Sequence, residues 1–406
     1  LAVEFAKKGF EVVGIDVDKE RVDRIRRKIS YITDVRTSDL KDVIRLKLLK
    51  AEDSFCALDQ IDVVFVCVPT PLKHKAHPDI SFIMSAVKQI RRYLHSGQLM
   101  ILESTTYPGT TEEEILPLLE TSGLTCGEDF FLAFSPERID PGNEKYPLRK
   151  IPKVIGGITK EATELAGLLY KNIVERVVPV NSARVAETVK LLENTFRIVN
   201  IGLIDEIAQM CHEMNIDIWE VIEAAMTKPF GFMGFYPGPG VGGHCIPKDP
   251  LYLYWKAKKF GFSSRFIKLS SEIISRMPHY VIERMEAALD KSGINLKRRK
   301  VLVIGVTYKK DVLDLRKSPA LDIIEGLMQK NIDVSYYDPL IPYLKINQLH
   351  LDSIKLTATT IKRFDCVLIV TDHSVIDYAF VLKNARLVFD TRNVYKGIAD
   401  KKLVRL

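Results

Sequence analysis

The sequence predicts an α/β protein in which two Rossmann-like, doubly wound parallel-sheet domains are joined by a long central helix and a helical domain. In the first third, apolar β-branched runs such as "FEVVGIDVD", "IDVVFVCVPTP" and "QLMILESTTYPGT" alternate with helical segments, a pattern typical of parallel strands buried on both faces. Apolar residues then recur at helical spacing over residues 182–216, and the α/β pattern returns from "KVLVIGVTYKKD" onward. We therefore expect three domains, at residues 1–178, 179–297 and 298–406.

The N-terminal domain repeats part of the C-terminal one. The segment "FAKKGFEVVGID" at 5–16 corresponds to "LMQKNIDVSYYD" at 327–338 in its helix end, turn, strand and terminal aspartate. The C-terminal copy has a strand and a loop before its helix, whereas the N-terminal copy begins within its helix at Leu1, without a capping residue. We expect the first strand of the N-terminal domain to be missing from this chain.

Asp16 ends the strand of this N-terminal copy. In a nucleotide-binding βαβ unit, an acid at this position bonds the ribose hydroxyls of the dinucleotide. A carboxylate repels a 2′-phosphate, so Asp16 favours NAD over NADP, although many surface strands also end in aspartate.

The long central helix carries an apolar stripe. Its members are Val185, Val189, Leu192, Phe196, Val199, Leu203 and Ile207. We interpret a stripe at this spacing as core and dimer contact rather than as a cofactor site.

The composition restricts the class of protein. Hydrophobic residues make up 47% and charged residues 27% of the chain, as in ordinary globular proteins. No apolar run approaches the roughly 18 residues of a membrane span, and the N-terminus lacks the order of a signal peptide, so we expect a cytoplasmic protein without a membrane partner. The net charge of +7 comes from basic residues spread along the chain, which argues against a nucleic-acid partner.

The six cysteines form no CxxC pair and are expected to be reduced. Cys67 and Cys366 lie in apolar runs and are predicted to be core residues. Cys245 instead lies in "PGPGVGGHCIPKDP", residues 237–250, where glycines and prolines indicate a shaped loop rather than a helix or strand. The sequence therefore predicts a specific position for the Cys245 thiol in this loop, and not the core role expected of Cys67 and Cys366.

No metal site is expected. His244 is adjacent to Cys245, and adjacent ligands point apart; His74 and His77 have no second pair at zinc spacing.

Six motifs in a fixed order give the chain a family resemblance. After the unit that ends at Asp16 come "VCVPTP", "ESTTYPGT", "FSPERIDPGN", "VAETVKLLENT", "GPGVGGHCIPKDP" and "GVTYKKDVLDLRKSP". With these motifs the chain closely resembles the UDP-glucose/GDP-mannose dehydrogenase family over essentially its whole length. The stretch "TKPFGFMGFYPGPG" resembles the branch that oxidises UDP-N-acetylglucosamine.

The resemblance implies that a primary alcohol is oxidised to a carboxylate in two hydride transfers to NAD, without release of the aldehyde. A thiol makes this possible, because its attack on the aldehyde gives a thiohemiacetal that is oxidised to a thioester. Residues 1–178 would bind NAD, residues 179–297 would carry the cysteine loop, and residues 298–406 would bind the UDP-sugar. A homodimer or a higher homo-oligomer is expected.

The resemblance also assigns roles to single residues. The implied catalytic residues are Cys245 as nucleophile, Lys190 and Asn194 at the oxyanion, Asp249 in water and base chemistry, and Glu137 with Thr105 in positioning water. The implied cofactor-binding residues are Asp16, Arg21, Thr70, Thr105 and Arg316. The implied substrate-binding residues are Lys309, Arg392, Gly242 and Gly243. Taken singly, these carboxylates could be helix-terminal or loop acids, and these cations could be surface charges.

Other functions stay open at this point. The same reaction on UDP-glucose or UDP-N-acetylmannosamine differs only in the residues that face C2 of the sugar. A 2-hydroxy-acid or sugar-phosphate dehydrogenase would need one hydride transfer and no thiol. A non-catalytic nucleotide-sugar-binding remnant would be consistent with the missing first strand, but the intact set of catalytic residue types argues against it.

Overall fold

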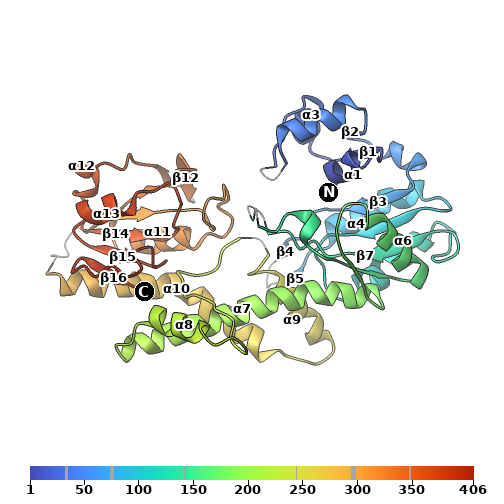
Figure 1. The fold of residues 1–406 in the computed structure, drawn as a ribbon. Helices are drawn as coiled ribbons and strands as arrows, with labels where there is room; N and C mark the ends of the chain where they lie inside the picture. Colours follow the sequence, from blue (N-terminus) through green and yellow to red (C-terminus); the bar gives the residue numbers. More distant parts are fainter. Residues whose placement is uncertain are drawn as a thin grey trace. The chain divides into compact units, whose positions relative to one another are not determined.

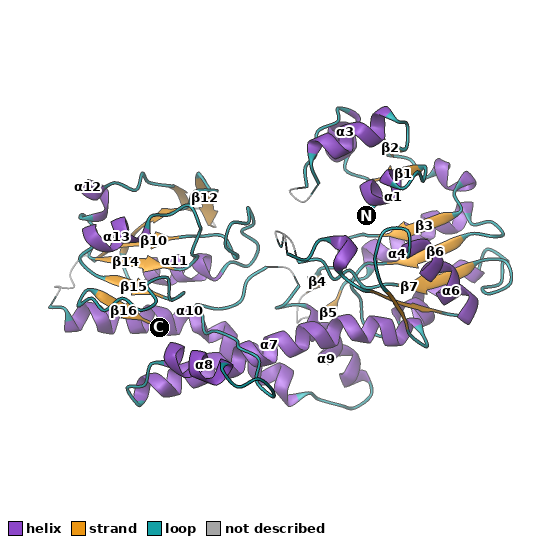
Figure 2. Cartoon of the chain, viewed as in Figure 1, coloured by secondary structure: helices purple, strands orange, loops and turns teal. Residues whose placement is uncertain are grey.

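The computed structural model describes residues 1–32, 35–73, 77–140, 143, 145–243, 245–293, 299–346 and 349–406. The chain forms two compact units, each described by itself below. The first unit comprises Leu1–Glu193 and Leu251–Phe262, and the second comprises Asn194–Pro250 and Ser263–Leu406. Figures 1 and 2 show the helices and strands of each unit. None of the described helices is both long and apolar enough to cross a membrane.

The helices and strands of the first unit are distributed along most of its length. Its helices are α1 (Ala2–Lys7), α2 (Lys19–Arg26), α3 (Thr37–Arg45), α4 (Ser81–Ile90), α5 (Leu116–Glu120), α6 (Lys160–Tyr170) and nearly all of α9 (Asp249–Lys259), with the turns η1 (Cys56–Gln60), η3 (Arg91–Tyr93), η4 (Thr111–Ile115, π-helical) and η5 (Leu148–Lys150). Its strands are β1 (Val12–Ile15), β2 (Leu49–Glu52), β3 (Val63–Val66), β4 (Leu72–Lys73), β5 (His77–Pro78), β6 (Leu99–Leu102), β7 (Phe131–Phe134), β8 (Lys153–Gly157) and β9 (Val177–Pro179).

The main sheet of the first unit has the order β3-β6-β7-β8-β9, and β1 pairs with β2 in a separate parallel pair. Helices α4 and α5 pack on one face of the main sheet, and α1 and α6 pack on the other. The expectation of parallel strands is wrong at one place, because β8 runs antiparallel to β7. The chain goes from β7 to β8 through a loop and the short turn η5, without the crossover helix that a parallel connection requires.

The second unit contains a fully parallel sheet of order β11-β10-β14-β15-β16. Its strands are β10 (Lys300–Ile304), β11 (Asp333–Tyr337), β12 (Tyr343–Ile346), β13 (Leu349–Asp352), β14 (Cys366–Ile369), β15 (Val388–Asp390) and β16 (Leu403–Arg405), of which β12 and β13 form an antiparallel hairpin. Its helices are α8 (Ile218–Met226), α10 (Arg265–Lys291), α11 (Pro319–Gln329), α12 (Ala358–Ile361) and α13 (Tyr378–Asn384).

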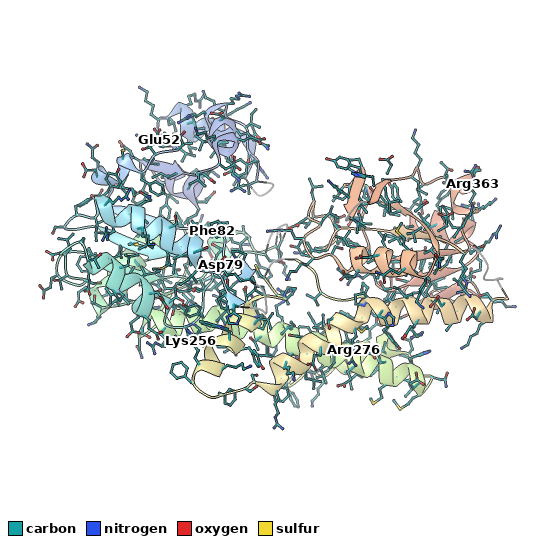
Figure 3. The ribbon with its side chains drawn as sticks, turned by 180° about the vertical axis from the view of Figure 1, so that it is seen from behind. Glu52, Asp79, Phe82, Lys256, Arg276 and Arg363 are labelled. Carbon is teal, nitrogen blue, oxygen red and sulfur yellow. The ribbon has the colours of Figure 1, made fainter. Side chains whose placement is uncertain are left out.

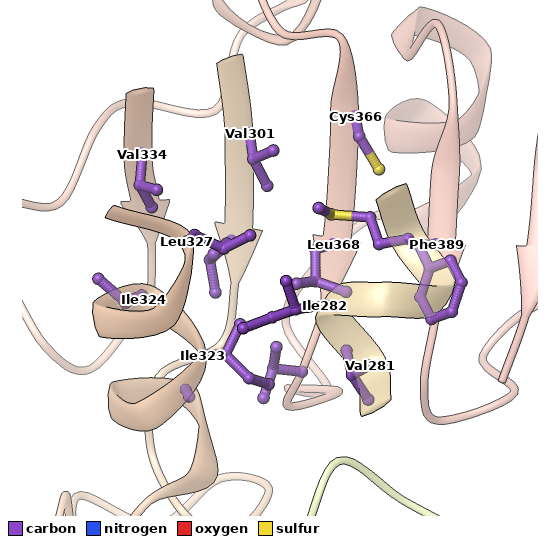
Figure 4. Close-up of a cluster of buried hydrophobic side chains, with 14 of the residues drawn as sticks. Val281, Ile282, Val301, Ile323, Ile324, Leu327, Val334, Cys366, Leu368 and Phe389 are labelled. Carbon is purple, nitrogen blue, oxygen red and sulfur yellow. The ribbon is translucent and has the colours of Figure 1, made fainter. Parts of the chain in front are cut away.

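Helices cover both faces of this second sheet, as a doubly wound fold requires. On one face Val281 and Ile282 of α10 pack with Ile323 and Leu327 of α11 against the strands (Figure 4). On the other face α12 and α13 contribute the apolar cover. Cys366 is part of the core, as predicted, and burial raises the pKa of its thiol to about 12. Cys67 is exposed, one residue beyond β3, so its predicted core role is wrong.

The long helix α7 (Ala183–Glu213) runs without a break from the first unit into the second. The predicted stripe is core only in part, because Val185, Leu192, Phe196 and Leu203 are 44–60% exposed, whereas Val189 and Ile207 pack against core clusters. The buried face of α7 carries Leu191 and Ile198 together with small and polar residues, among them Ala186, Glu187, Asn194, Asp205 and Ala208. These four exposed apolar side chains therefore point away from the core of the unit to which each residue belongs.

The predicted repeat is present, since α1, β1 and Asp16 correspond to α11, β11 and Asp338. The two aspartates differ in their partners. Asp338 is buried, accepts the backbone N–H groups of Val306 at 2.7 Å and Leu340 at 2.8 Å, and contacts His373 Nε2 at 3.1 Å. Asp338 is thereby committed to bonds within the protein, whereas Asp16 is only half-buried.

Candidate active site

The cysteine loop is held by close backbone packing within the second unit. At Gly242 a Cβ atom would lie 2.6 Å from the carbonyl oxygen of Lys317, and at Gly243, where φ is +86°, it would lie 2.8 Å from the ring of Tyr308. Gly243 also donates its N–H to the carbonyl of Arg316 at 2.8 Å. Only glycine fits both positions, so the loop can lie directly on the chain segment 308–317.

The start of the loop is fixed in the same way. Gly238 donates its N–H to Oδ1 of the buried Asp205 on α7 at 3.1 Å. A Cβ atom at Gly238 would lie 3.0 Å from Nη1 of Arg392, so a side chain there would require the guanidinium to shift. The loop is therefore held at both ends before it reaches Cys245.

Cys245 is exposed and stands just ahead of α9, where its carbonyl accepts the N–H of Asp249 at 2.8 Å. Asp249 opens α9 and is fully buried; its Oδ2 accepts Asn194 Nδ2 at 2.6 Å. The structure thus brings Asn194, Asp249 and the cysteine loop together.

Lys248 is a candidate site residue that the sequence analysis did not name. It is 4% exposed and lies between Cys245 and Asp249 in the chain. Burial lowers the pKa of Lys248; the acid Asp249 and the thiol of Cys245 oppose this effect, and the cations Lys317 and Arg316 reinforce it. Cations around a thiol favour its thiolate form. The signal for Lys248 was its place in "PKD", inside the cysteine motif itself.

Lys190 lies one turn before Asn194 on α7 and is half-buried. It belongs to the first unit, whereas Asn194 belongs to the second. Their shared helix face is the predicted one, and the contact of Lys190 with reacting atoms stays a prediction.

Glu137 in the first unit belongs to a network of charges. Its Oε1 accepts the backbone N–H groups of Arg138 at 2.6 Å and Ile139 at 2.7 Å, and its Oε2 lies 3.3 Å from Lys153 Nζ. Lys153 is buried and also pairs with the buried Glu103 at 2.7 Å. Burial favours a higher pKa for Glu137, but the Lys153 ammonium and the two N–H groups outweigh it and hold the pKa below its ordinary value.

This network keeps Glu137 ionised near neutral pH, as a base or a water-orienting group requires. Glu103 and Lys153 were missed by the sequence analysis. Glu103 opens the quoted "ESTTYPGT", but Lys153 carried no local signal.

The predicted cofactor residues of the first unit lie at the ends of strands. Asp16 follows β1, where its Oδ2 pairs with Arg21 Nη1 at 3.3 Å. Thr105 lies half-buried in the loop after β6, and Thr70 is buried in the loop after β3, where its carbonyl accepts the Tyr252 hydroxyl at 2.9 Å. Loops at the carboxyl ends of parallel strands bind nucleotides in α/β sheets. The half-exposed Asp16 carboxylate next to Arg21 suits ribose hydroxyls and therefore fits NAD.

The predicted cations of the second unit occupy the loops after its strands. Lys309 is half-buried, and its carbonyl accepts the Thr307 hydroxyl at 3.0 Å. Arg316 pairs with Asp314 at 2.6 Å and keeps 64% of its side chain exposed. Arg392 donates Nε to the carbonyl of Val370 at 2.7 Å. Burial lowers the pKa of Arg392, and the carboxylates of Asp372, Asp205 and Asp390 oppose that effect.

Within the described part of the chain, no cluster of three metal-ligating side chains occurs. His74 and His244, two of the histidines weighed as ligands, lie outside the described residues.

Models of one family match three successive parts of the chain. Its NAD-binding domain matches residues 1–174, its central domain matches residues 184–274, and its UDP-binding domain matches residues 302–397. The chain belongs to the UDP-glucose/GDP-mannose dehydrogenase family. Membership makes the protein one of the NAD-dependent UDP-sugar dehydrogenases, with NAD bound by the N-terminal domain.

Two relatives show how close the match is within this UDP-sugar dehydrogenase family. The UDP-N-acetyl-D-glucosamine 6-dehydrogenase of Pseudomonas aeruginosa is 39% identical over 342 residues, covering 84% of this chain and 79% of the relative. The UDP-N-acetyl-D-mannosamine dehydrogenase of Pyrococcus horikoshii is 35% identical over 402 residues, covering 97% and 93%.

Solved structures of related dehydrogenases are similar to this chain over its whole length. The structure of UDP-D-ManNAc dehydrogenase from Pyrococcus horikoshii has a TM-score of 0.89 at 33% identity, covering 100% of this chain and 94% of that one. The structure of a UDP-glucose dehydrogenase from Pyrobaculum islandicum has a TM-score of 0.86 at 24% identity, covering 100% and 93%, and shows the same fold.

Proposed function

We propose that the protein oxidises C6 of UDP-N-acetylglucosamine to UDP-N-acetylglucosaminuronate in a four-electron reaction that consumes two NAD. The observation that carries this proposal is the exposed Cys245 thiol, presented by a tightly held loop directly ahead of the buried pair of Asn194 and Asp249. A dehydrogenase that transfers a single hydride has no need of such a thiol.

The proposed reaction converts RCH₂OH, two NAD⁺ and water into RCOO⁻, two NADH and three protons. NAD, when bound, accepts the hydride in each oxidation. Cys245 adds to the C6 aldehyde as a thiolate, so that an S–C bond forms and the carbonyl oxygen takes a proton. Oxidation of this thiohemiacetal gives a thioester, and water then cleaves the S–C bond and returns the thiol.

The remaining residues stabilise charge and direct water in this proposal. Lys190 and Asn194 stabilise the oxyanion at C6, where a fixed cation and an amide donor act on developing charge. Asp249 serves the water and base chemistry next to the thiol. Glu137, held ionised by Lys153, positions water together with Thr105.

The C-terminal domain and the cysteine loop hold the substrate in this proposal. Lys309 and Arg392 bind its anionic nucleotide part, Arg316 contacts the cofactor, and Gly242 with Gly243 contributes backbone contacts. Cations match the diphosphate of a UDP-sugar. In this proposal Asp16, Arg21 and Thr70 bind the cofactor, NAD.

An acetamido sugar is favoured over glucose by the relatives, which act on UDP-N-acetylglucosamine or UDP-N-acetylmannosamine by name. UDP-N-acetylmannosamine is the second candidate, because its dehydrogenase from Pyrococcus horikoshii aligns with 97% of this chain. The two sugars differ in configuration at C2, so both would leave the chemistry at Cys245 unchanged.

We also propose a homodimer, or a higher homo-oligomer, that acts in the cytoplasm. Support for the oligomer comes from Phe196, Leu203 and Met210, which are 47–51% exposed at a spacing of seven on α7. Residues seven apart share one helix face. The domain division at 1–178, 179–297 and 298–406 remains a proposal as well.

The test is the number of NADH molecules formed per UDP-sugar consumed, with UDP-N-acetylglucosamine, UDP-N-acetylmannosamine and UDP-glucose in parallel. We expect a ratio of two with UDP-N-acetylglucosamine, and loss of the uronate product in Cys245→Ser. As a control, Cys56→Ser replaces another exposed cysteine and should keep the ratio of two. A ratio of one, or an unaffected Cys245→Ser variant, would exclude the thioester route.

A further inference from the structure

Asp205 is a buried acid on α7 to which neither the motifs nor the proposed reaction assigns a role. It is 0% exposed, and its Oδ1 receives a hydrogen bond from the N–H of Gly238 at 3.1 Å. Among the described residues, Oδ2 is buried and has no hydrogen-bond partner. A carboxylate oxygen in this situation is costly when charged, and far less so when the acid is neutral.

The neighbours of Asp205 belong to the two parts that the proposed reaction uses. Gly238 opens the loop that leads to Cys245. The guanidinium of Arg392 lies against Gly238, with Nη1 3.0 Å from the position of a Cβ there, and its charge acts on Asp205. Among the described residues, the charge of Arg392 acts on Asp205, and the carboxylates of Asp372 and Asp390 also act on Arg392.

We propose that Asp205 is a positioning residue that anchors the cysteine loop on α7 and sets how much positive charge Arg392 presents to an anionic substrate. The part that concerns Arg392 rests on the proposed function, in which Arg392 binds the UDP-sugar. The part that concerns the loop does not depend on it.

The protonation state of Asp205 determines how affinity for the UDP-sugar changes with pH. Burial raises the pKa of Asp205 to about 8, against the opposing effects of the Gly238 N–H and Arg392. At neutral pH the acid is mostly neutral, and the positive charge of Arg392 is available to the substrate. Above pH 8 the carboxylate forms, offsets that charge and repels an anionic ligand. Affinity for the UDP-sugar should therefore fall as the pH rises through about 8.

The first arm of the test measures binding of UDP-N-acetylglucosamine by calorimetry, without NAD, at about pH 6.5 and about pH 8.5 on either side of the titration. If the ionised form does not bind, Kd in the wild-type protein increases up to about fourfold between these values. Asp205→Asn keeps an acceptor for Gly238 but cannot ionise, so its Kd should change less than about 1.5-fold. Glu206→Gln, an exposed neighbour on α7, is the matched control and should behave as wild type.

The second arm measures alkylation of Cys245 by iodoacetamide at neutral pH, followed on the Cys245 peptide by mass spectrometry. Asp205→Ala removes the acceptor for Gly238 and should slow alkylation at least about threefold, because the loosened thiol loses its place beside Lys248 and Arg316. Asp205→Asn should stay within about twofold of wild type, because its amide oxygen replaces Oδ1.

The outcomes test the charge-setting role and the anchoring role of Asp205 separately. A Kd with the same pH dependence in wild type and Asp205→Asn would overturn the charge-setting role. A wild-type alkylation rate in a folded Asp205→Ala variant would overturn the anchoring role. If Asp205→Ala does not fold, as judged by its thermal melting, a slowed Asp205→Asn would overturn the view that the acceptor alone holds the loop. Absence of UDP-sugar binding by the wild-type protein would refute the proposed function and the Arg392 part together, while alkylation would still decide the loop part.

Discussion

Glu187 and Asp205 are two buried acids on α7, 18 residues or about five helical turns apart. Each accepts backbone N–H groups of a loop. Glu187 binds those of Gly109 at 2.5 Å and Thr111 at 2.9 Å in the first unit, whereas Asp205 binds Gly238 in the second. A polar side chain of α7 therefore secures one loop in each unit.

Glu187→Gln should flatten the pH dependence of stability. Burial raises the pKa of Glu187 to about 7, despite the hydrogen bonds from Thr111 and Gly109 that lower it. The folded state therefore keeps a proton that the unfolded state releases above its lower pKa. This group's contribution to the free energy of unfolding falls as the pH rises toward 7, by about 2 kcal/mol between about pH 5 and pH 7. Urea unfolding at these two pH values measures the change.

The isosteric amide should reduce the pH-dependent change by that amount, whereas Glu164→Gln at an exposed site should leave it intact. A Glu187→Gln variant with the full wild-type pH dependence would show that Glu187 does not keep its proton on folding.

Single residues were predictable from sequence where chemistry and motif coincide. The cysteine loop was recognised from its glycines and prolines, and Asn194 and Asp249 were assigned by the family resemblance. The structure brings Asn194 and Asp249 together. Lys153 could not be found in this way, because its partners Glu103 and Glu137 lie 50 and 16 residues earlier in the chain and meet it only in the folded sheet. Buried ion pairs of this kind leave no local pattern.

At the level of elements, the cysteine loop depends on glycines for two separate reasons. Gly243 has a positive φ and also no space for a Cβ, whereas Gly261 has a similar φ of +77° but nothing within 4 Å. The two positions therefore separate steric packing from backbone conformation.

Gly243→Ala should lower kcat at least about tenfold, since even a 1 Å displacement of a reacting group can cost about a hundredfold. Gly261→Ala is the control and should cost only the backbone strain, about 1–2 kcal/mol of stability, with kcat unchanged. Steady-state kinetics and thermal unfolding of both variants provide the measurement. Equal kcat values in the two variants would mean that the close contact with Tyr308 does not position the loop.

Strand and helix types followed from periodicity, but two features of the elements did not. The direction of β8 depends on how the chain returns after β7, which apolar pattern alone does not encode. The sequence located the apolar stripe on α7, but which of its residues are exposed could be learned only from the fold, because helical spacing does not say which partner covers a face.

At the scale of the whole molecule, the exposed side of α7 determines assembly in our proposal. Leu203→Glu should convert the oligomer to a monomer, because a charge placed at the centre of an apolar interface is not compensated. Multi-angle light scattering on the purified protein measures the mass. Val375→Glu, at a position 75% exposed elsewhere in the second unit, is the control and should leave the mass unchanged. A monomeric wild type, or an oligomeric Leu203→Glu variant, would contradict this arrangement.

The order of the units along the chain also limits the positions at which chimeras with a related protein can be joined. The chain passes from the first unit to the second after Glu193, returns after Pro250 and leaves again after Phe262. Neither unit is thus one continuous gene segment, and a chimera joined at Glu193 would separate most of α9 from the rest of the first unit, where the Tyr252 hydroxyl donates to the carbonyl of Thr70. A donor of a new nucleotide-binding domain should instead be joined beyond α10, where a single crossover exchanges the whole parallel sheet of the second unit.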